Sequence, residues 1–342
     1  MHIDGTYKIT SHGYPLVIFG ITDLQGKFHP IVFMITSHEK QVDFHHLYSN
    51  LVNIADQLNI EFNPEFIMQD ACGASYNAAV AVFGERVTIL MCYYHVKANL
   101  LKHKHLLKGV DVYEEFEADV NELHFSCTEA TFEERLRLFK TKYAKSQKAM
   151  FKYFEDEWLK GNFNKWQIFR NAPGFANTNS NIESFNATFK RDFTKRIRGS
   201  LITACTKLYN CISYYSLPTN NIWYSYPEFD KQIKDWALKI NKSCFTKFGR
   251  TGRKFKYTGK VRNFFILTDD KRCYKSVSCN CVPFIKWALF SHVVAFSNAY
   301  LLDIYGKEYR QSNKFVKKIK KGAKPKRSGR YKLASSALNT DD

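Results

Sequence analysis

The sequence has little of what marks a fibrous, disordered or membrane-spanning chain. Only 16 glycines and 8 prolines occur among 342 residues, which excludes a collagen-like or low-complexity protein. The longest apolar runs, at 14–21 and 31–35, are far shorter than the about 20 residues that a membrane-spanning helix requires. Because 45% of the residues are hydrophobic, the chain has ample material for a packed core. We therefore expect a soluble, folded protein that does not contact a membrane.

Cysteine usage and charge narrow the class further. The nine cysteines are odd in number and scattered, and no secretory signal opens the sequence, so we expect a reducing compartment rather than a disulfide framework. The 51 lysines and arginines exceed the 32 acidic residues and give a net charge of +19. Such an excess favours a polyanionic partner, above all nucleic acid. The alternative is a basic protein whose charge serves only solubility.

The first hundred residues alternate between strand and helix patterns. A short β-prone segment at 2–10 precedes two apolar runs, 14–22 and 28–36, which a turn separates; they predict a hairpin. Apolar residues then recur at helical spacing from 44 to 58. Strands are predicted at 66–68 and 87–91, and helices at 71–83 and 94–107. A strand meander followed by this alternation predicts a mixed α/β sheet covered by helices.

Three acidic residues stand out by their positions. Asp4 lies within the first predicted strand, where aspartate is depleted, and Asp70 comes where the fourth strand stops. Glu183 falls in the first turn of a predicted helix, with Asn186 and Lys190 on the same helix face. Each has a structural alternative: Asp70 as the N-cap of the following helix, and Glu183 as a partner of a helix dipole.

The flanking motifs give these residues a common interpretation. The segments His2–Lys8, 13–16, Phe66–Asp70, 92–100 and 181–186 occur in an order that resembles the transposase domain of Mutator-like elements (MULE) over residues 1–200. The resemblance implies a ribonuclease-H-like mixed sheet with an all-helical insertion. It also implies that Asp4, Asp70 and Glu183 form a metal-binding acidic triad.

The triad fits the chemistry that the resemblance implies. Cleavage and strand transfer of DNA at transposable-element ends build charge on phosphate oxygens, which two Mg²⁺ or Mn²⁺ ions can stabilise. These ions prefer carboxylate oxygens to histidine or cysteine. The family further implies DNA as partner and a homo-oligomer on DNA. A nuclear location is expected from the basic residues 317–330.

Two cysteine–histidine motifs raise the question of zinc. Cys92-x-x-His95 is half of a zinc site, yet a cysteine beside an apolar strand is often a core residue. The family resemblance favours a third interpretation, in which Cys92 and His95 belong to the catalytic centre. Further on, Cys279, Cys281 and His292 resemble a SWIM-type zinc finger, but Phe290 stands where its third cysteine belongs. Since structural zinc needs four ligands, the finger is degenerate unless another group such as Cys273 substitutes.

These patterns divide the chain into five segments. They are 1–110, the first part of the ribonuclease-H-like core; 111–176, the helical insertion; 177–245, the catalytic and trailing helices; 255–300, the small β/α SWIM-like region; and 314–342, a basic tail predicted to be disordered that resembles a nuclear localisation signal.

One departure from the family supports a rival function. Related transposases usually carry an N-terminal DNA-reading domain, whereas the given sequence has three residues ahead of Asp4. Together with Phe290, this favours a shortened copy. The alternative to an active enzyme is therefore a domesticated or truncated DNA-binding regulator that retains the fold without catalysis.

Overall fold

The computed structural model describes most of the chain up to residue 299. The described residues are 1–23, 26–109, 111–171, 174, 176–217, 231–248, 254–258, 263–268, 277–279, 281–282 and 291–299. The chain divides into two units, Met1–Ile304 and Tyr305–Asp342, and the second lies outside the described residues. Among the described helices, none combines the length and apolar character needed to cross a bilayer.

A mixed five-stranded sheet forms the centre of the N-terminal part. Its strands are β1 (His2–Thr6), β2 (Leu16–Thr22), β3 (Phe28–Ile35), β4 (Phe66–Gln69) and β5 (Thr88–Met91). They lie in the order β3-β2-β1-β4-β5. The first three pair antiparallel, whereas β4 runs parallel to β1 and to β5. The predicted mixed α/β architecture is therefore confirmed.

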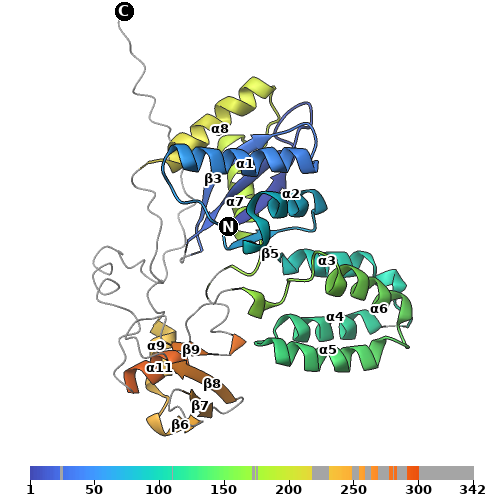
Figure 1. Cartoon of the computed structure of the whole chain (residues 1–342), viewed down its shortest axis with the longest axis vertical. Helices are drawn as coiled ribbons and strands as arrows, with labels where there is room; N and C mark the ends of the chain where they lie inside the picture. Colours follow the sequence, from blue (N-terminus) through green and yellow to red (C-terminus); the bar gives the residue numbers. More distant parts are fainter. Residues whose placement is uncertain are drawn as a thin grey trace, which may run out of the picture. The chain divides into compact units, whose positions relative to one another are not determined.

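Helices cover both faces of this sheet (Figure 1). One face, with Val17 and Ile67, packs against α1 (Gln41–Gln57) and α2 (Gly73–Phe83). The opposite face, with Ile18, packs against α7 (Ser180–Thr188) and α8 (Leu201–Tyr215). Because successive strand residues point to opposite faces, Asp4 shares the α7 face with His2 while Ile3 packs under α1.

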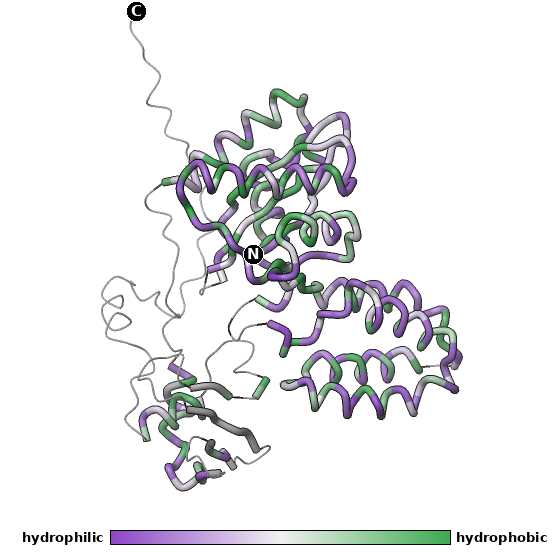
Figure 2. The backbone as a smooth tube through the Cα atoms, viewed as in Figure 1, coloured by the Kyte–Doolittle hydropathy of each residue, from purple (hydrophilic) through white to green (hydrophobic). Residues whose placement is uncertain are grey.

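The segment between β5 and α7 forms a helical bundle with its own core. Its elements are α3 (Tyr93–Lys102), the 3₁₀ turn η2 (Lys104–Leu106), α4 (Val112–His124), α5 (Glu129–Tyr143), α6 (Lys148–Phe154), the π-helical turn η3 (Glu155–Lys160) and the 3₁₀ turn η4 (Ile168–Arg170). Phe116 and Phe154 are fully buried there with Trp158. Figure 2 shows apolar and polar residues alternating along these helices, as expected for amphipathic helices that share one core.

The C-terminal described residues form a small antiparallel sheet and two helices. The strands, in sheet order, are β6 (Phe245–Phe248), β7 (Lys254–Thr258), β8 (Asn263–Thr268) and β9 (Val277–Cys279). The helices are α9 (Lys231–Leu238) and α11 (Ser291–Ala299). The predicted β-then-α pattern of this region is present, and β6 extends the sheet by a strand that the sequence patterns did not predict.

Two element boundaries differ from the predictions in ways that concern the site. The first strand ends at Thr6 rather than at residue 10, because Lys8 has a left-handed φ of 66° that breaks the ladder. Helix α2 begins at Gly73 and its N-cap is Cys72. The alternative interpretation of Asp70 as a helix N-cap is therefore wrong, which leaves that carboxylate without a local structural role.

Candidate active site

Strand ends bring the first two carboxylates to one edge of the sheet. Asp4 lies in β1 and Asp70 follows the last residue of β4, and these strands are parallel neighbours. The carboxyl ends of parallel strands are the usual place for a site in an α/β sheet. Both aspartates line a hollow of about 200 Å³, which Glu39 and Cys72 also border.

Two of the three acidic residues predicted as a triad act electrostatically on the third, Asp4. The pKa of Asp4 is raised from 3.8 to about 7, first by burial and then by the negative charges of Asp70 and Glu183. The charge of His95 opposes this rise. Glu183 reaches the site from the first turn of α7, the helix that covers this sheet face. Asp4, Asp70 and Glu183 are separated by 66 and 113 residues in the sequence, and the fold brings Asp70 and Glu183 close enough to act on Asp4. The three carboxylates are not among the described groups whose potential ligand atoms all lie within 4.8 Å of one another.

An ion pair and a hydrogen bond hold one oxygen of Asp70. Oδ1 lies 2.9 Å from Nδ1 of His95 and accepts a 3.0 Å hydrogen bond from Nδ2 of Asn179. Oδ2 makes no hydrogen bond or ion pair with any residue that the structure describes. This arrangement fixes the carboxylate while one of its oxygens stays available to a ligand.

The Cys92-x-x-His95 motif belongs to the same site. The pKa of His95 is raised to about 10, chiefly by its contacts with Asp70 and then with Cys92, so the imidazole is a cation at neutral pH. Cys92 is fully buried beside Met68 and Leu90, as its core interpretation predicts. The potential ligand atoms of Asp70, Cys92 and His95 lie within 4.8 Å of one another. An imidazolium has no free lone pair for a metal, which favours an ion pair with Asp70 over a zinc half-site.

Asn179, which the sequence analysis missed, connects all the elements of the site. Its side chain is fully buried, and Nδ2 donates to Asp70 and to the carbonyl of Ile3, at 3.0 and 3.2 Å. Its backbone N–H donates to Sγ of Cys92 at 3.3 Å, and its carbonyl accepts from the N–H of Glu183 at 2.9 Å. One residue therefore ties β1, β4, α3 and α7 together beside the carboxylates.

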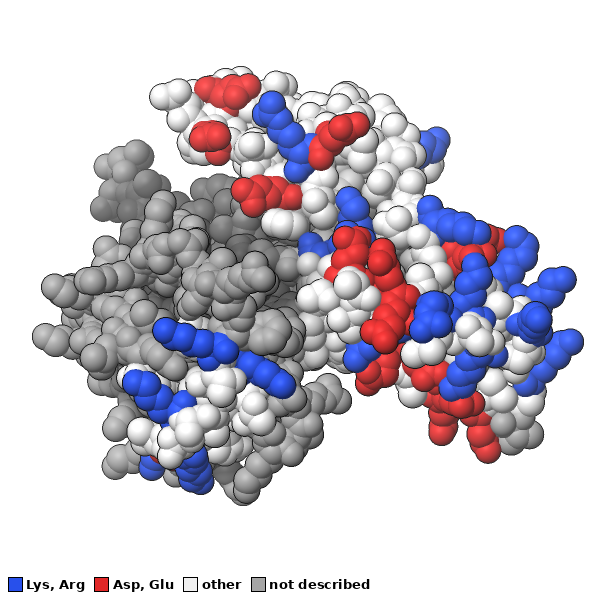
Figure 3. Space-filling view, turned by 60° about the horizontal axis from the view of Figure 1, so that its bottom comes forward, with Lys and Arg blue, Asp and Glu red and all other residues white. Residues whose placement is uncertain are grey.

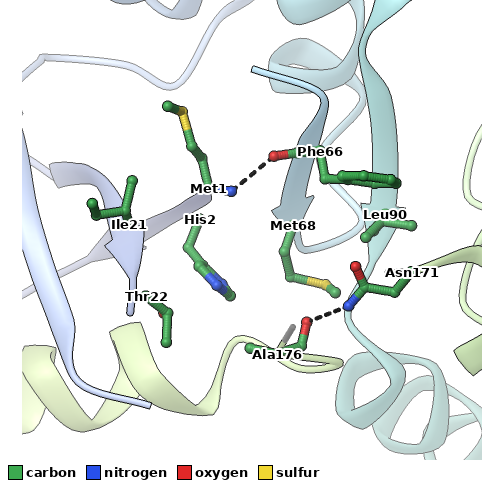
Figure 4. A pocket seen from close by; sticks show the side chains of 9 residues that line it. All are labelled: Met1, His2, Ile21, Thr22, Phe66, Met68, Leu90, Asn171 and Ala176. Carbon is green, nitrogen blue, oxygen red and sulfur yellow. Dashed lines mark hydrogen bonds between the residues drawn. The ribbon is translucent and has the colours of Figure 1, made fainter. Parts of the chain in front are cut away.

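His2 completes the hydrogen bonding of this asparagine. Its Nδ1 lies 3.2 Å from Oδ1 of Asn179. Burial lowers the pKa of His2 to about 3, so the ring is neutral, and Nδ1 carries the proton if Oδ1 is to accept it. His2 also lines a separate pocket of about 240 Å³ on the same sheet face, mostly among apolar side chains such as Met68 and Leu90 (Figure 4). That pocket contains none of the three carboxylates.

Asn186 gives the site a second asparagine, on the face of α7 that the helix spacing predicted. Its Nδ2 donates to Oδ2 of Asp4 at 2.6 Å. Its Oδ1 is buried and has no hydrogen-bond partner among the described residues. Burial lowers the pKa of Lys190, one turn further along, and the negative charge of Asp4 opposes this shift. A buried orphan acceptor beside three repelling carboxylates fits a site that binds a hydrated cation.

The predicted zinc ligands near the C-terminus also come together. Nε2 of His292 lies 3.0 Å from Sγ of Cys279 and 3.4 Å from Sγ of Cys281, and all three side chains are buried. The ring of Tyr257 stacks on His292 with centroids 5.2 Å apart. Two thiols and an imidazole are the donors that zinc prefers, so the residues present fit three of its four ligands. Phe290 and Cys273 lie outside the described residues.

The comparison with family models identifies the N-terminal part of the chain. Residues 1–99 match the MULE transposase domain, which confirms the predicted resemblance over that range. The match includes Asp4, Asp70, Cys92 and His95, whereas Glu183 lies beyond it. A search of curated proteins found no match. The evidence for Glu183 is therefore its place in the fold.

Proposed function

We propose that this chain is the catalytic core of a DNA transposase that cleaves DNA and transfers the released 3′-hydroxyl to a target strand. The single observation that carries the proposal is the electrostatic environment of Asp4, whose pKa is raised first by burial and then by the negative charges of Asp70 and Glu183. Carboxylates that repel one another in a buried site gain most from a bound cation. The MULE match supports a transposase-related function from the sequence side.

We infer that the catalytic part has a ribonuclease-H-like fold. Three observations support this: the sheet order β3-β2-β1-β4-β5, the helices on both faces, and the helical bundle between β5 and α7. That bundle accounts for the long sequence interval between Asp70 and Glu183. The predicted domain limits, 1–110, 111–176 and 177–245, follow from the same interpretation.

The carboxylates would hold Mg²⁺ or Mn²⁺, and other residues of the chain would keep them in place. When bound, the ions supply positive charge that activates the entering oxygen and stabilises the leaving one. Asn186 orients Asp4 through the 2.6 Å bond to Oδ2. His95 and Asn179 both hold Oδ1 of Asp70, so Oδ2 is the oxygen that would bind the metal ion. The hollow beside Asp4 and Asp70 gives a phosphate access to this edge.

DNA is the partner that this activity requires, and the net charge of +19 supports it. A nuclear location and assembly as a homo-oligomer on DNA are part of the same proposal. The basic segment 314–342, which motivates the nuclear location, lies outside the described residues.

A strand-transfer assay tests the proposal. The purified chain is incubated with Mn²⁺, a plasmid target and a labelled duplex that carries free 3′-hydroxyls, alongside Asp70→Asn. Asp192→Asn serves as the matched control, since Asp192 pairs with Arg191 away from the triad. We expect metal-dependent nicking and joining by the wild type and by the control, and none by Asp70→Asn. DNA binding by the wild type without any metal-dependent cleavage would contradict the proposal and favour the regulator.

A further inference from the structure

Five lysines gather on two neighbouring turns of the helical bundle. Lys102 and Lys104 come from the end of α3 and from η2, Lys108 follows η2, and Lys145 and Lys148 flank the α5–α6 turn. All five are exposed, and none makes an ion pair with a described residue. We call this set the distal lysine patch. Figure 3 shows basic side chains gathered over the bundle, at the right of the view.

The other bundle lysines with ion pairs provide an internal contrast. Lys97 pairs with Glu117, Lys142 with Glu115 and Asp119, and Lys152 with Asp156, at 2.6 to 2.7 Å. Lys140 and Lys160 lie 3.8 and 2.8 Å from the carboxylate of Glu155. Acidic residues thus neutralise the lysines along the helices, but not those at the two turns. Unpaired cations concentrated at one end of a domain are the charge pattern that attracts a polyanion.

Direct contacts hold the two turns of the patch together. The buried side chain of Gln147 accepts from the N–H of Lys108 at 2.8 Å and donates to its carbonyl at 3.0 Å. The ring of His103 stacks on Tyr153 of α6, with centroids 4.1 Å apart. The lysine backbones therefore form a preorganised surface, although their side chains are free to reach a ligand.

Helix α3 sets the distance between the patch and the catalytic site. It begins after Cys92, carries His95 in its first turn and ends at Lys102, a length of 10 residues. At about 1.5 Å per residue the helix spans roughly 15 Å. Along each strand of B-form DNA, backbone phosphates recur about every 3.4 Å of the helix axis. A duplex with its reacting phosphate at Asp70 therefore carries further backbone phosphates at the distance of the patch.

We propose that the distal lysine patch binds the phosphate backbone of duplex DNA about 15 Å along the duplex from the phosphate at the carboxylates. The inference rests on the proposed function, which supplies DNA as the substrate, and it adds a surface of the protein that holds this DNA. Lysine contacts to phosphate fix the position of the duplex without reading its sequence. DNA binding through the patch would therefore not depend on the sequence of a terminal repeat.

The salt dependence of DNA binding tests this surface. Fluorescence anisotropy with a labelled random-sequence duplex of 30 base pairs, in EDTA and at several KCl concentrations, is measured for Lys104→Gln/Lys108→Gln/Lys148→Gln. The control is Lys140→Gln/Lys152→Gln/Lys160→Gln, which removes the same charge from lysines that are ion-paired. Each lost phosphate contact lowers the slope of log K against log salt by about 0.9. We expect the patch variant to lose about 2 to 3 from this slope and to bind at least tenfold more weakly at 0.1 M KCl.

The control variant separates local contacts from general charge. It should keep most of the wild-type slope, since its three lysines already pair with the two carboxylates of Glu155 and Asp156. Equal losses in both triple variants, or no loss in the patch variant, would overturn the inference. Circular dichroism and thermal unfolding test whether both variants fold, as expected for substitutions at exposed positions.

The proposed function and the patch fail in different ways. If the wild type joins DNA in Mn²⁺ and the patch variant binds duplex DNA as the wild type does, only the proposal for the patch is refuted. Wild-type protein that binds no duplex even at low salt refutes both. Wild-type protein that binds through the patch but never cleaves supports the surface and contradicts the catalytic assignment.

Discussion

Replacing Asp4 by asparagine should stabilise the metal-free protein at neutral and alkaline pH. Burial and the charges of Asp70 and Glu183 raise the pKa of Asp4 from 3.8 to about 7. Between these two values the folded state binds more protons than the unfolded state, so stability falls as pH rises through this window. Asparagine resembles the protonated form and can still accept the hydrogen bond from Asn186. The variant therefore avoids this loss.

The size of the effect follows from the pKa shift. A shift of about 3 units at 1.36 kcal/mol per unit gives about 4 kcal/mol of difference between variant and wild type above pH 7. Below about pH 4 the difference should vanish, because Asp4 is then protonated in both states. Mg²⁺ should narrow the difference above pH 7, since a cation at 100 times its Kd stabilises the wild type by about 2.7 kcal/mol and has no complete site in the variant.

Urea unfolding followed by tryptophan fluorescence measures this difference in EDTA at pH 4, 6 and 8. Asp192→Asn is a control with the opposite pH dependence. The pairing with Arg191 lowers the pKa of Asp192, so the ionised carboxylate stabilises the wild type, and this stabilisation is lost as pH falls. An Asp4→Asn variant that is no more stable than the wild type at pH 8, or a difference that does not vary with pH, would refute the electrostatic reasoning.

Three further predictions concern the groups around the carboxylates and the second cluster. Asn179→Ala should weaken Mn²⁺ binding in isothermal titration and destabilise the fold by about 3 kcal/mol, because two buried bonds are lost and their acceptors stay unsatisfied; Asn171→Ala, a buried asparagine elsewhere, should leave Mn²⁺ affinity unchanged. The wild type should be more stable than His95→Gln, and this advantage should be largest below about pH 6.5 and disappear as pH rises through about 10. The reason is that the contact with Asp70 raises the pKa of His95. Unfolding curves that show the opposite trend would contradict the ion pair. Zinc bound at Cys279, Cys281 and His292 requires a fourth ligand; if mass spectrometry finds zinc in the purified protein, His292→Ala should lose it because a buried ligand is removed, and equal zinc in both would exclude this cluster.

Local sequence patterns were sufficient to predict the sheet and the first two carboxylates. Period-two alternation and helical spacing are set by neighbouring residues, so the hairpin 14–36 and the strand before Asp70 were predictable. The position of Asp4 inside a strand was itself a signal, because a carboxylate there needs a reason. Glu183 depended on the family motif, and its side-chain environment became clear only from the packing of α7 on the sheet.

The supporting residues of the site were harder to predict for a physical reason. Asn179 contacts partners 176, 109 and 87 residues earlier in the sequence, so no periodicity or spacing identifies it. The choice between an N-cap and a free carboxylate at Asp70 likewise depended on where α2 begins, and helix starts are weakly encoded locally. The clustering of Cys279, Cys281 and His292 was predictable from the motif, because a short strand–helix unit brings them together.

Binding of Mn²⁺ to Glu183→Gln tests the central claim most directly, since Glu183 lies outside the matched domain and the metal centre needs all three carboxylates. Electron paramagnetic resonance counts free and bound Mn²⁺ for the wild type, Glu183→Gln and the control Asp192→Asn, whose carboxylate pairs with Arg191. Saturable binding by the wild type and the control, with loss of bound Mn²⁺ in Glu183→Gln, is the result that our account predicts. Binding by Glu183→Gln that equals the wild type would show that the three carboxylates do not form one metal centre.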